Sequence, residues 1–154
     1  MHILMCNDDG ILADGLRQLA TYLSQYYRVT VVAPATEQSA KSHALTTEIP
    51  LKLDAYNGED ENPRLYALTG TPSDCMKFGL SYLLADDMPD LVISGINHGF
   101  NLGSDVLYSG TVSAAMESAF YGIPGLALSV ERYSVERGHE MHPFIHELIE
   151  KIYV

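Results

Sequence analysis

The sequence has no tryptophan, only two cysteines and few basic residues. Cys6 and Cys75 cannot build a network of disulfides, and neither belongs to a CxxC pair, so a disulfide-rich scaffold is excluded. Nine Lys and Arg stand against 20 Asp and Glu, a net charge of −11. That balance argues against a nucleic-acid polymer as partner, because binding to phosphate backbones depends on Lys and Arg.

Long apolar runs and a basic N-terminal segment are also missing. A membrane-spanning helix needs ~20 apolar residues, which no run approaches, and a secretion signal begins with basic residues. The sequence therefore predicts a cytoplasmic protein that makes no membrane contact. The length of 154 residues, with 47% hydrophobic and 19% charged residues, is typical of one globular unit. We expect a single domain over residues 1–154.

Short apolar runs alternate with stretches of helical periodicity. Strands are predicted at 2–6, 28–33, 90–96 and 125–130, with a strand pair at 49–55 and 64–68. Helices are predicted at about 14–26, 71–85, 111–121 and 143–153, and residues 35–48 form a long polar loop. Strands separated by helices form βαβ units. We therefore expect an α/β, Rossmann-like three-layer fold with a mainly parallel sheet and helices on both faces.

Two of these helices carry further local signals. Thr71 is a candidate N-cap, followed by Pro72 at the first helical position and Asp74 at the third. The helix at 111–121 has an apolar stripe, the pattern of an amphipathic helix. The stripe consists of Val112, Ala115, Met116 and Ala119.

The first strand ends in Asn7-Asp8-Asp9-Gly10. Ligands of parallel sheets bind beyond the carboxyl ends of the strands. Two adjacent carboxylates repel each other there, and a proton or a cation relieves the repulsion. An ordinary turn is the alternative interpretation, since Asn, Asp and Gly are common turn residues.

The strand at 90–96 opens into a glycine-rich segment. Gly95, Gly99 and Gly103 leave room for a ligand against the backbone. Asn97 and Asn101 offer amide oxygens, which suit hard cations such as Mg²⁺ or Ca²⁺. Alternatively, the segment is a flexible loop whose asparagines bind backbone groups.

Ser109, Gly110 and Thr111 lead directly into the next helix. Hydroxyls and free N–H groups at a helix start can bind an anion, although an ordinary N-cap uses the same residues. No Lys or Arg occurs between Lys77 and Arg132, so a phosphate-binding P-loop is excluded. An anion bound here would need backbone dipoles and a metal ion to hold it.

Together, these segments resemble the SurE (survival protein E) family of metal-dependent phosphatases. The segments NDDG, PATEQSAKSHALT, GTPSDC, SGINHGFNLGSDVLYSGTVSAAMES and GIPGLALS occur in the family's order over residues 1–130. The resemblance implies a 5′-nucleotidase that hydrolyses nucleoside 5′- and 3′-monophosphates. It also implies a homodimer or homotetramer.

The resemblance further implies one divalent cation per chain, Mg²⁺ or Mn²⁺ and also Ca²⁺ as a candidate. Its ligands would be Asp8, Asp9, Ser39 and Asn97. The phosphate would face Asn97, Asn101, Ser109, Gly110 and Thr111, and the catalytic residues would be Asp8 and Asn101. Asp8 either orients or deprotonates the attacking water, or itself attacks through an aspartyl-phosphate.

Two features depart from the family pattern. Ala40 follows Ser39 where the family has glycine, and family members continue beyond the end of this sequence, which predicts a truncated chain. A non-catalytic fragment that binds nucleotide or metal is therefore the alternative function. A signalling receiver domain is disfavoured, because Asn97 and Glu131 stand where a receiver needs Asp and Lys.

Overall fold

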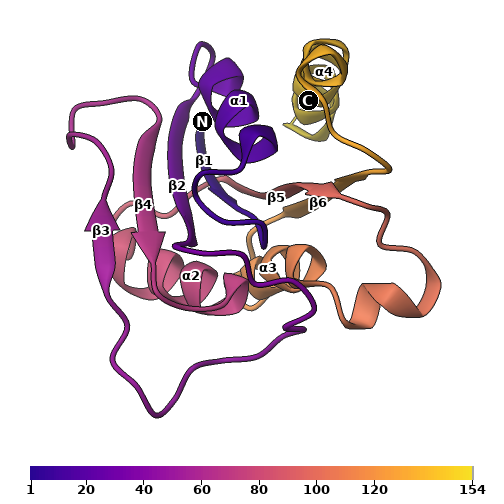
Figure 1. Ribbon diagram of the computed structural model, residues 1–154. Helices are drawn as coiled ribbons and strands as arrows, with labels where there is room; N and C mark the ends of the chain where they lie inside the picture. Colours follow the sequence, from indigo (N-terminus) through magenta and orange to yellow (C-terminus); the bar gives the residue numbers. More distant parts are fainter. Residues whose placement is uncertain (154) are drawn as a thin grey trace.

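The computed structural model describes residues 1–153 and contains a six-stranded sheet in the order β3-β4-β2-β1-β5-β6 (Figure 1). The strands are β1 (His2–Cys6), β2 (Arg28–Pro34), β3 (Leu53–Ala55), β4 (Arg64–Leu68), β5 (Leu91–His98) and β6 (Gly125–Val130). The helices are α1 (Asp14–Leu23), α2 (Pro72–Phe78), α3 (Gly110–Ala119) and α4 (Val135–Tyr153). A π-helical segment, Gly79–Leu83, continues α2, and a 3₁₀ helix, Gly103–Leu107, lies before α3.

All neighbouring strands are parallel except β3, which runs antiparallel to β4. Helices α1 and α4 lie on one side of the sheet, and α2 and α3 on the other (Figure 1). The expected three-layer α/β fold is thus confirmed. Strand β1 lies in the middle of the sheet and is buried along its whole length. It therefore delivers the residues that follow Cys6 to the centre of one sheet edge.

Each face of the sheet has its own hydrophobic core. Residues such as Leu16 and Leu19 of α1 and Ile149 of α4 pack against one face, and Met76 and Leu80 pack against the other. A fully buried aliphatic side chain of this size stabilises the fold by about 1.5–3 kcal/mol. These contacts hold the strand ends that build the site in fixed positions.

Several element boundaries agree with the sequence prediction. Strands β1, β4 and β6 have the predicted bounds, and β3 begins at Leu53, later than expected. Thr71 and Asp74 form the predicted capping box at the start of α2, because each side chain accepts a hydrogen bond from the other's backbone N–H. Helix α1 ends earlier than predicted. Hydrogen bonds from Tyr26 N to Leu23 O, and from Gln25 N to Tyr22 O, replace the α-helical pattern there.

The predicted start of the last helix is wrong. Helix α4 begins at Val135, and Pro143 lies inside it. The hydroxyl and the carbonyl of Ser134 accept hydrogen bonds from backbone N–H groups of the first turn, so this residue caps the helix. Proline removes one backbone hydrogen bond inside the helix, and the burial of Ile145 and Ile149 offsets that loss.

Helix α3 turns its apolar stripe away from the sheet. Met116 is 54% exposed, whereas Ser113, Glu117 and Ser118 are buried. The reason is the close approach of α3 to β6: a Cβ on Gly125 would lie 2.5 Å from the carbonyl oxygen of Ala115. Only small or hydrogen-bonded side chains fit at such a contact, so the helix buries its small polar face.

Cys6 and Cys75 are buried free thiols, as expected for Cys6. None of the helices described over residues 1–153 has the length and apolar character needed to cross a bilayer.

Candidate functional site

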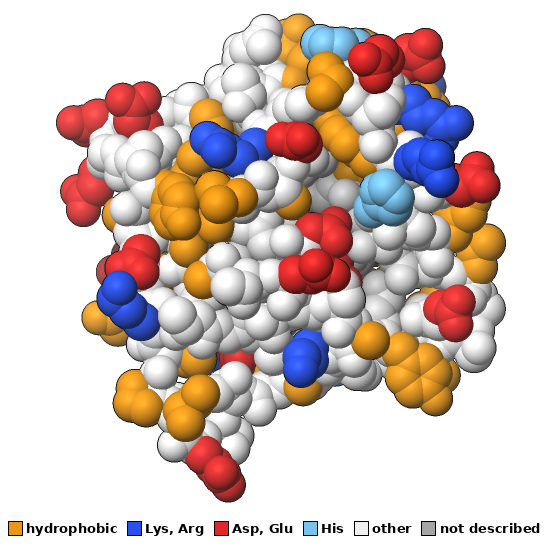
Figure 2. All heavy atoms as spheres, in the orientation of Figure 1, with side chains coloured by type: hydrophobic (Ala, Val, Ile, Leu, Met, Phe, Trp, Pro, Cys, Tyr) orange, Lys and Arg blue, Asp and Glu red, His pale blue; other side chains and the backbone are white. Residues whose placement is uncertain are grey.

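A cavity of about 780 Å³ opens where β1 and β5 end. Side chains from both strand ends, from the 35–48 loop and from the segment before α3 line it. Six of the predicted site residues lie together at this cavity: Asp8, Asp9, Ser39, Asn97, Asn101 and Ser109. In Figure 2, acidic side chains gather beside a hollow in the middle of the face shown.

Asp8 sits on a turn that Asn7 holds in place. The amide of Asn7 accepts a hydrogen bond from Gly10 N and donates one to Gly10 O, at 3.1 and 3.0 Å. Asp8 is only 5% exposed, and its Oδ1 accepts a 2.6 Å hydrogen bond from the hydroxyl of Thr111. Burial raises the pKa of Asp8, and the Thr111 hydroxyl offsets part of that rise. The carboxylate is thus buried and oriented before any ligand arrives.

Asp9 shares the cavity with other acids. Burial raises the pKa of Asp9, the negative charges of Asp8 and Glu37 raise it further, and His98 acts in the opposite direction. Five acidic residues line the cavity, and His98 is the only basic side chain among the described residues that do so. A cation would relieve this repulsion, whereas an anion could not bind here without one.

An irregularity in β5 brings Asn97 to the cavity. The pairing with β6 shifts between Ser94 and Asn97, and Gly95 at this point has a φ of +120°. A Cβ at Gly95 would lie 2.3 Å from the carbonyl oxygen of Leu128, so only glycine fits. The strand continues to His98, beyond the predicted end at residue 96.

The two asparagines are held by their NH₂ groups. Asn97 Nδ2 donates to Gly99 O at 2.8 Å, and Asn101 Nδ2 donates to Ser129 Oγ at 2.7 Å. Neither hydrogen bond occupies an amide oxygen. Both side chains therefore keep the oxygen that a hard cation or a donor group would use.

The 35–48 loop supplies Ser39. The Ser39 hydroxyl donates to Glu37 Oε1 at 2.7 Å, and Gln38 N donates to Asp8 O at 2.7 Å, which ties the loop to the end of β1. Ala40 has a φ of +57°, a left-handed conformation that favours glycine. The loop thus adopts a glycine-type backbone although alanine stands at this position.

The residues of the Ser109-Gly110-Thr111 turn lie in two different environments, one at the cavity and one behind Asp8. Ser109 caps α3 by accepting from Val112 N at 3.1 Å, and it lines the cavity. Gly110 and Thr111 lie behind Asp8 and are not among the lining residues. A Cβ on Gly110 would come within 2.9 Å of the Asp8 Cβ, and Thr111 is fully buried. The hydroxyl of Thr111 therefore contacts Asp8 in this structure.

The sequence interpretation missed Glu37, Asp14 and Tyr133. Glu37 stands in a polar loop without periodicity, and Asp14 lies in the first turn of α1, where an acidic residue is common. Tyr133 lines the cavity and donates to Gln18 Oε1 at 2.9 Å. Its place just after β6, at the carboxyl edge of the sheet, is the signal in the sequence that could have identified it.

The donor set fits a hard divalent cation. Among residues 1–153, no group of three or more His, Cys, Asp or Glu side chains is arranged to hold a metal ion. The predicted ligands include only two such side chains, Asp8 and Asp9, and the others are a serine hydroxyl and an asparagine amide. Oxygen donors in an acidic cavity are what Mg²⁺ and Mn²⁺ prefer.

Comparisons with known proteins agree with this architecture. The family model "Survival protein SurE" matches residues 3–154. The 5′-nucleotidase SurE of Thermoanaerobacter sp. (strain X514) is 51% identical over 152 residues, which cover 99% of this chain and 60% of that protein. The 5′-nucleotidase SurE of Thermosipho africanus is 54% identical over 139 residues, 88% of this chain and 52% of that protein.

A solved structure is also similar. The crystal structure of SurE protein from Aquifex aeolicus superposes with a TM-score of 0.86 at 39% identity, and the match covers 99% of this chain and 60% of that chain. The chain thus spans about 60% of the length of the first of these relatives and of this crystallised protein.

Proposed function

The chain belongs to the SurE family, and we propose that it is a phosphomonoesterase that hydrolyses nucleoside 5′- and 3′-monophosphates with a divalent cation. Similarity to proteins named 5′-nucleotidase SurE supports the nucleotidase class. The observation that carries the proposal is the cavity itself. Asp8, Asp9, Ser39 and Asn97 offer oxygen donors there, and the described lining contains neither Lys nor Arg. A bound cation would offset the acidic lining and make the site attractive to a phosphate.

We assign Asp8, Asp9, Ser39 and Asn97 as ligands of one Mg²⁺ or Mn²⁺ ion, with Ca²⁺ as a further candidate. When bound, a divalent cation supplies positive charge to the phosphoryl oxygens and lowers the pKa of a water molecule. Asn97, Asn101 and Ser109 would face the phosphate, whereas Gly110 and Thr111, which were also expected to face it, do not line the cavity and would act only as part of the N-terminus of α3. The N-terminus of α3 and the Asn101 amide would stabilise its negative charge.

Asp8 is the residue best placed to act on the nucleophile. Its Oδ1 accepts the hydrogen bond from Thr111, and Oδ2 is the oxygen that this bond does not occupy. Burial and the bond from Thr111 hold the Asp8 carboxylate in one orientation, and a positioned carboxylate can accept a proton from water. In the proposed reaction Asp8 orients and deprotonates the attacking water. Direct attack by Asp8 through an aspartyl-phosphate is the competing route. The stereochemistry at a chiral phosphorus distinguishes the two, with inversion for direct attack by water and retention for the aspartyl-phosphate.

The rim of the cavity suits the nucleoside half of such a substrate. Phe100 and Tyr108, which are more than half exposed, line the cavity together with Tyr133. Aromatic faces bind nucleobases by stacking, worth about 1–3 kcal/mol for each base. These side chains therefore favour nucleotides over small phosphate esters without a ring.

Substitution of one proposed ligand tests the assignment. Asp9→Asn keeps the shape of the side chain and removes its charge, so the Mn²⁺ concentration for half-maximal phosphate release from AMP should rise by about 10–100-fold. Asp105→Asn, which also removes a carboxylate from the cavity lining, is the matched control. If Asp9→Asn keeps full activity at the ordinary Mn²⁺ concentration while its circular dichroism is unchanged, the metal assignment is wrong.

The remaining expectations stay predictions. They are a single domain over 1–154, a homodimer or homotetramer for the family's full-length proteins, and a cytoplasmic location without nucleic-acid or membrane partners. A non-catalytic fragment that binds nucleotide is the alternative, and it would bind AMP in the presence of Mn²⁺ without releasing phosphate.

A further inference from the structure

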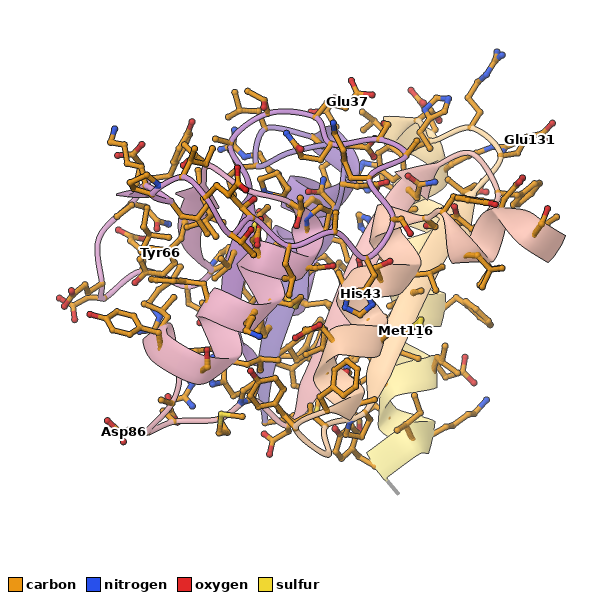
Figure 3. The ribbon with its side chains drawn as sticks, turned by 90° about the horizontal axis from the view of Figure 1, so that it is seen from below. Glu37, His43, Tyr66, Asp86, Met116 and Glu131 are labelled. Carbon is orange, nitrogen blue, oxygen red and sulfur yellow. The ribbon has the colours of Figure 1, made fainter. Side chains whose placement is uncertain are left out.

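A partly buried hydrogen bond between His43 and Glu117 joins the 35–48 loop to α3. Nε2 of His43 lies 2.6 Å from Oε2 of Glu117, and in Figure 3 the ring of His43 lies against this helix. The side chain of Glu117 is only 7% exposed, whereas that of His43 is 31% exposed. Neither residue lines the large cavity or has a role in the proposed reaction.

The burial of Glu117 calls for an explanation. The chain already carries a net charge of −11, and a buried carboxylate is costly unless a partner compensates it. Helix α3 could bury a small uncharged residue at this position, as it does at Ser113 and Ser118. The pair with His43 gives the carboxylate its partner. The same contact connects α3 to the 35–48 loop.

Helix α3 contacts two parts of the proposed metal site. At its first turn, Thr111 donates to the carboxylate of Asp8. Further along the same buried face, Glu117 holds His43, which lies four residues after Ser39. A rigid helix therefore sets the distance between Asp8 and the loop that carries Ser39.

The loop needs such a support because it has no regular secondary structure of its own. Ser39 is exposed, and its neighbours Ala40 and Ser42 have left-handed φ angles of 57° and 54°. Ser42 is tied to the opposite rim, with its N–H donating to Tyr108 O and its hydroxyl donating to Leu107 O. Ser42, which lies between Ser39 and His43, thus links this part of the loop to the rim.

We propose that Glu117 is a positioning residue which, through His43, holds the 35–48 loop so that Ser39 stays beside Asp8 and Asp9 as a metal ligand. This inference rests on the proposed function, since it takes Ser39 as a ligand. Groups that hold metal-binding residues in place typically contribute 10–100-fold to metal affinity. Glu117 therefore positions a proposed metal ligand and does not bind the metal itself.

Two substitutions test the role. His43→Ala removes the partner from a partly exposed loop residue, and Glu117→Gln keeps a side-chain oxygen that can accept a hydrogen bond from Nε2–H of His43. Mn²⁺ alone is titrated calorimetrically into each variant, and amide hydrogen exchange over residues 37–46 is followed without metal. Glu140→Gln, which removes an exposed carboxylate from α4, is the control for charge.

His43→Ala should weaken Mn²⁺ binding by about tenfold or more and speed exchange in the loop, while exchange in β1 stays unchanged. Glu117→Gln should retain more affinity than His43→Ala, because the hydrogen bond survives, and Glu140→Gln should behave as the unsubstituted chain. Unchanged Mn²⁺ affinity and unchanged loop exchange in His43→Ala would overturn the role of Glu117. Absence of Mn²⁺ binding by the unsubstituted chain would instead overturn the metal site, and with it the proposed function.

Discussion

Thr111 and Asp8, which are 103 positions apart in the sequence, meet through a 2.6 Å hydrogen bond from the threonine hydroxyl to Oδ1 of the carboxylate. Both residues are buried. The bond joins the first turn of α3 to the residues that follow β1. The orientation of Asp8 therefore depends on where α3 packs against β5 and β6. The bond also leaves one oxygen of Asp8 for the site.

Removal of this hydroxyl should therefore destabilise the fold and disturb Asp8. Thr111→Val keeps the shape of the side chain but leaves a buried carboxylate without its donor, which should lower the free energy of unfolding by about 1–3 kcal/mol. Urea unfolding at pH 7 measures the change. Thr21→Val, at an exposed position of α1, is the matched control. Equal stabilities of the two variants would show that the bond contributes nothing.

Ala40 offers a stabilising substitution. Its φ of +57° costs a residue with a Cβ about 1–2 kcal/mol, whereas glycine adopts this angle freely. Ala40→Gly should raise the free energy of unfolding by up to about 1 kcal/mol, because the gain exceeds the extra entropy of glycine in the unfolded chain. Ala44→Gly in the same loop has no such strain to relieve and should be neutral or destabilising. If both variants behave alike in urea unfolding, the left-handed backbone at Ala40 carries no cost.

Gly95 should tolerate no side chain. In Gly95→Ala the new Cβ would meet the carbonyl oxygen of Leu128 at 2.3 Å, in addition to the cost of a positive φ. We expect a loss of about 3 kcal/mol or more in unfolding free energy, from strain and a disrupted β5–β6 contact. Gly99→Ala has a similar φ of +106° but nothing within 4 Å of the new atom, so its loss should stay near 1–2 kcal/mol. Similar losses in the two variants would show that the contact with Leu128 is unimportant.

Asp74 should make stability depend on pH. Burial alone would raise its pKa, but hydrogen bonds from Thr46 and Thr71 outweigh burial and hold the pKa of Asp74 below its ordinary value of 3.8. In acid the unfolded chain takes up the proton before the folded chain does. The stabilisation is therefore present above about pH 4 and is lost as pH falls through the lowered pKa.

Thr46→Val removes the 2.6 Å bond from the Thr46 hydroxyl and should cost about 1–2 kcal/mol at pH 7. The difference from the unsubstituted chain should shrink as the pH of the thermal unfolding series falls from about 5 to about 2. Thr36→Val, at an exposed position of the same loop, controls for the change of side chain. A difference that stays constant over this pH range would contradict the assignment to Asp74.

The bounds of a strand or helix could be predicted well wherever the local pattern of apolar residues determines them. β1 and β6 have the predicted bounds because a short apolar run in an α/β chain is typical of a buried strand and too short for a helix. The orientation of α3 could not be predicted in this way. Its apolar stripe faces outward because Gly125 of β6 approaches the helix backbone closely, and that contact exists only in three dimensions.

The candidate site shows the same division. Asp8 and Asp9 follow β1, and Asn97 and Asn101 lie at and just after the end of β5, so the rule for parallel sheets places them at one edge. Glu37 and the pair of His43 with Glu117 lie in a loop and on a helix face. Their positions depend on the path of the loop over α3, and the spacing of apolar residues in the sequence does not predict that path.

The most direct test of the central claim is phosphate release by the purified chain from AMP and GMP, first with Mn²⁺ or Mg²⁺ and then with excess EDTA. We predict release that depends on the metal and disappears in EDTA. Release that continues unchanged in EDTA would contradict a metal-dependent reaction. Binding of AMP with Mn²⁺ but without any release, in this chain and in one extended to the length of its relatives, would contradict the assignment as a phosphatase.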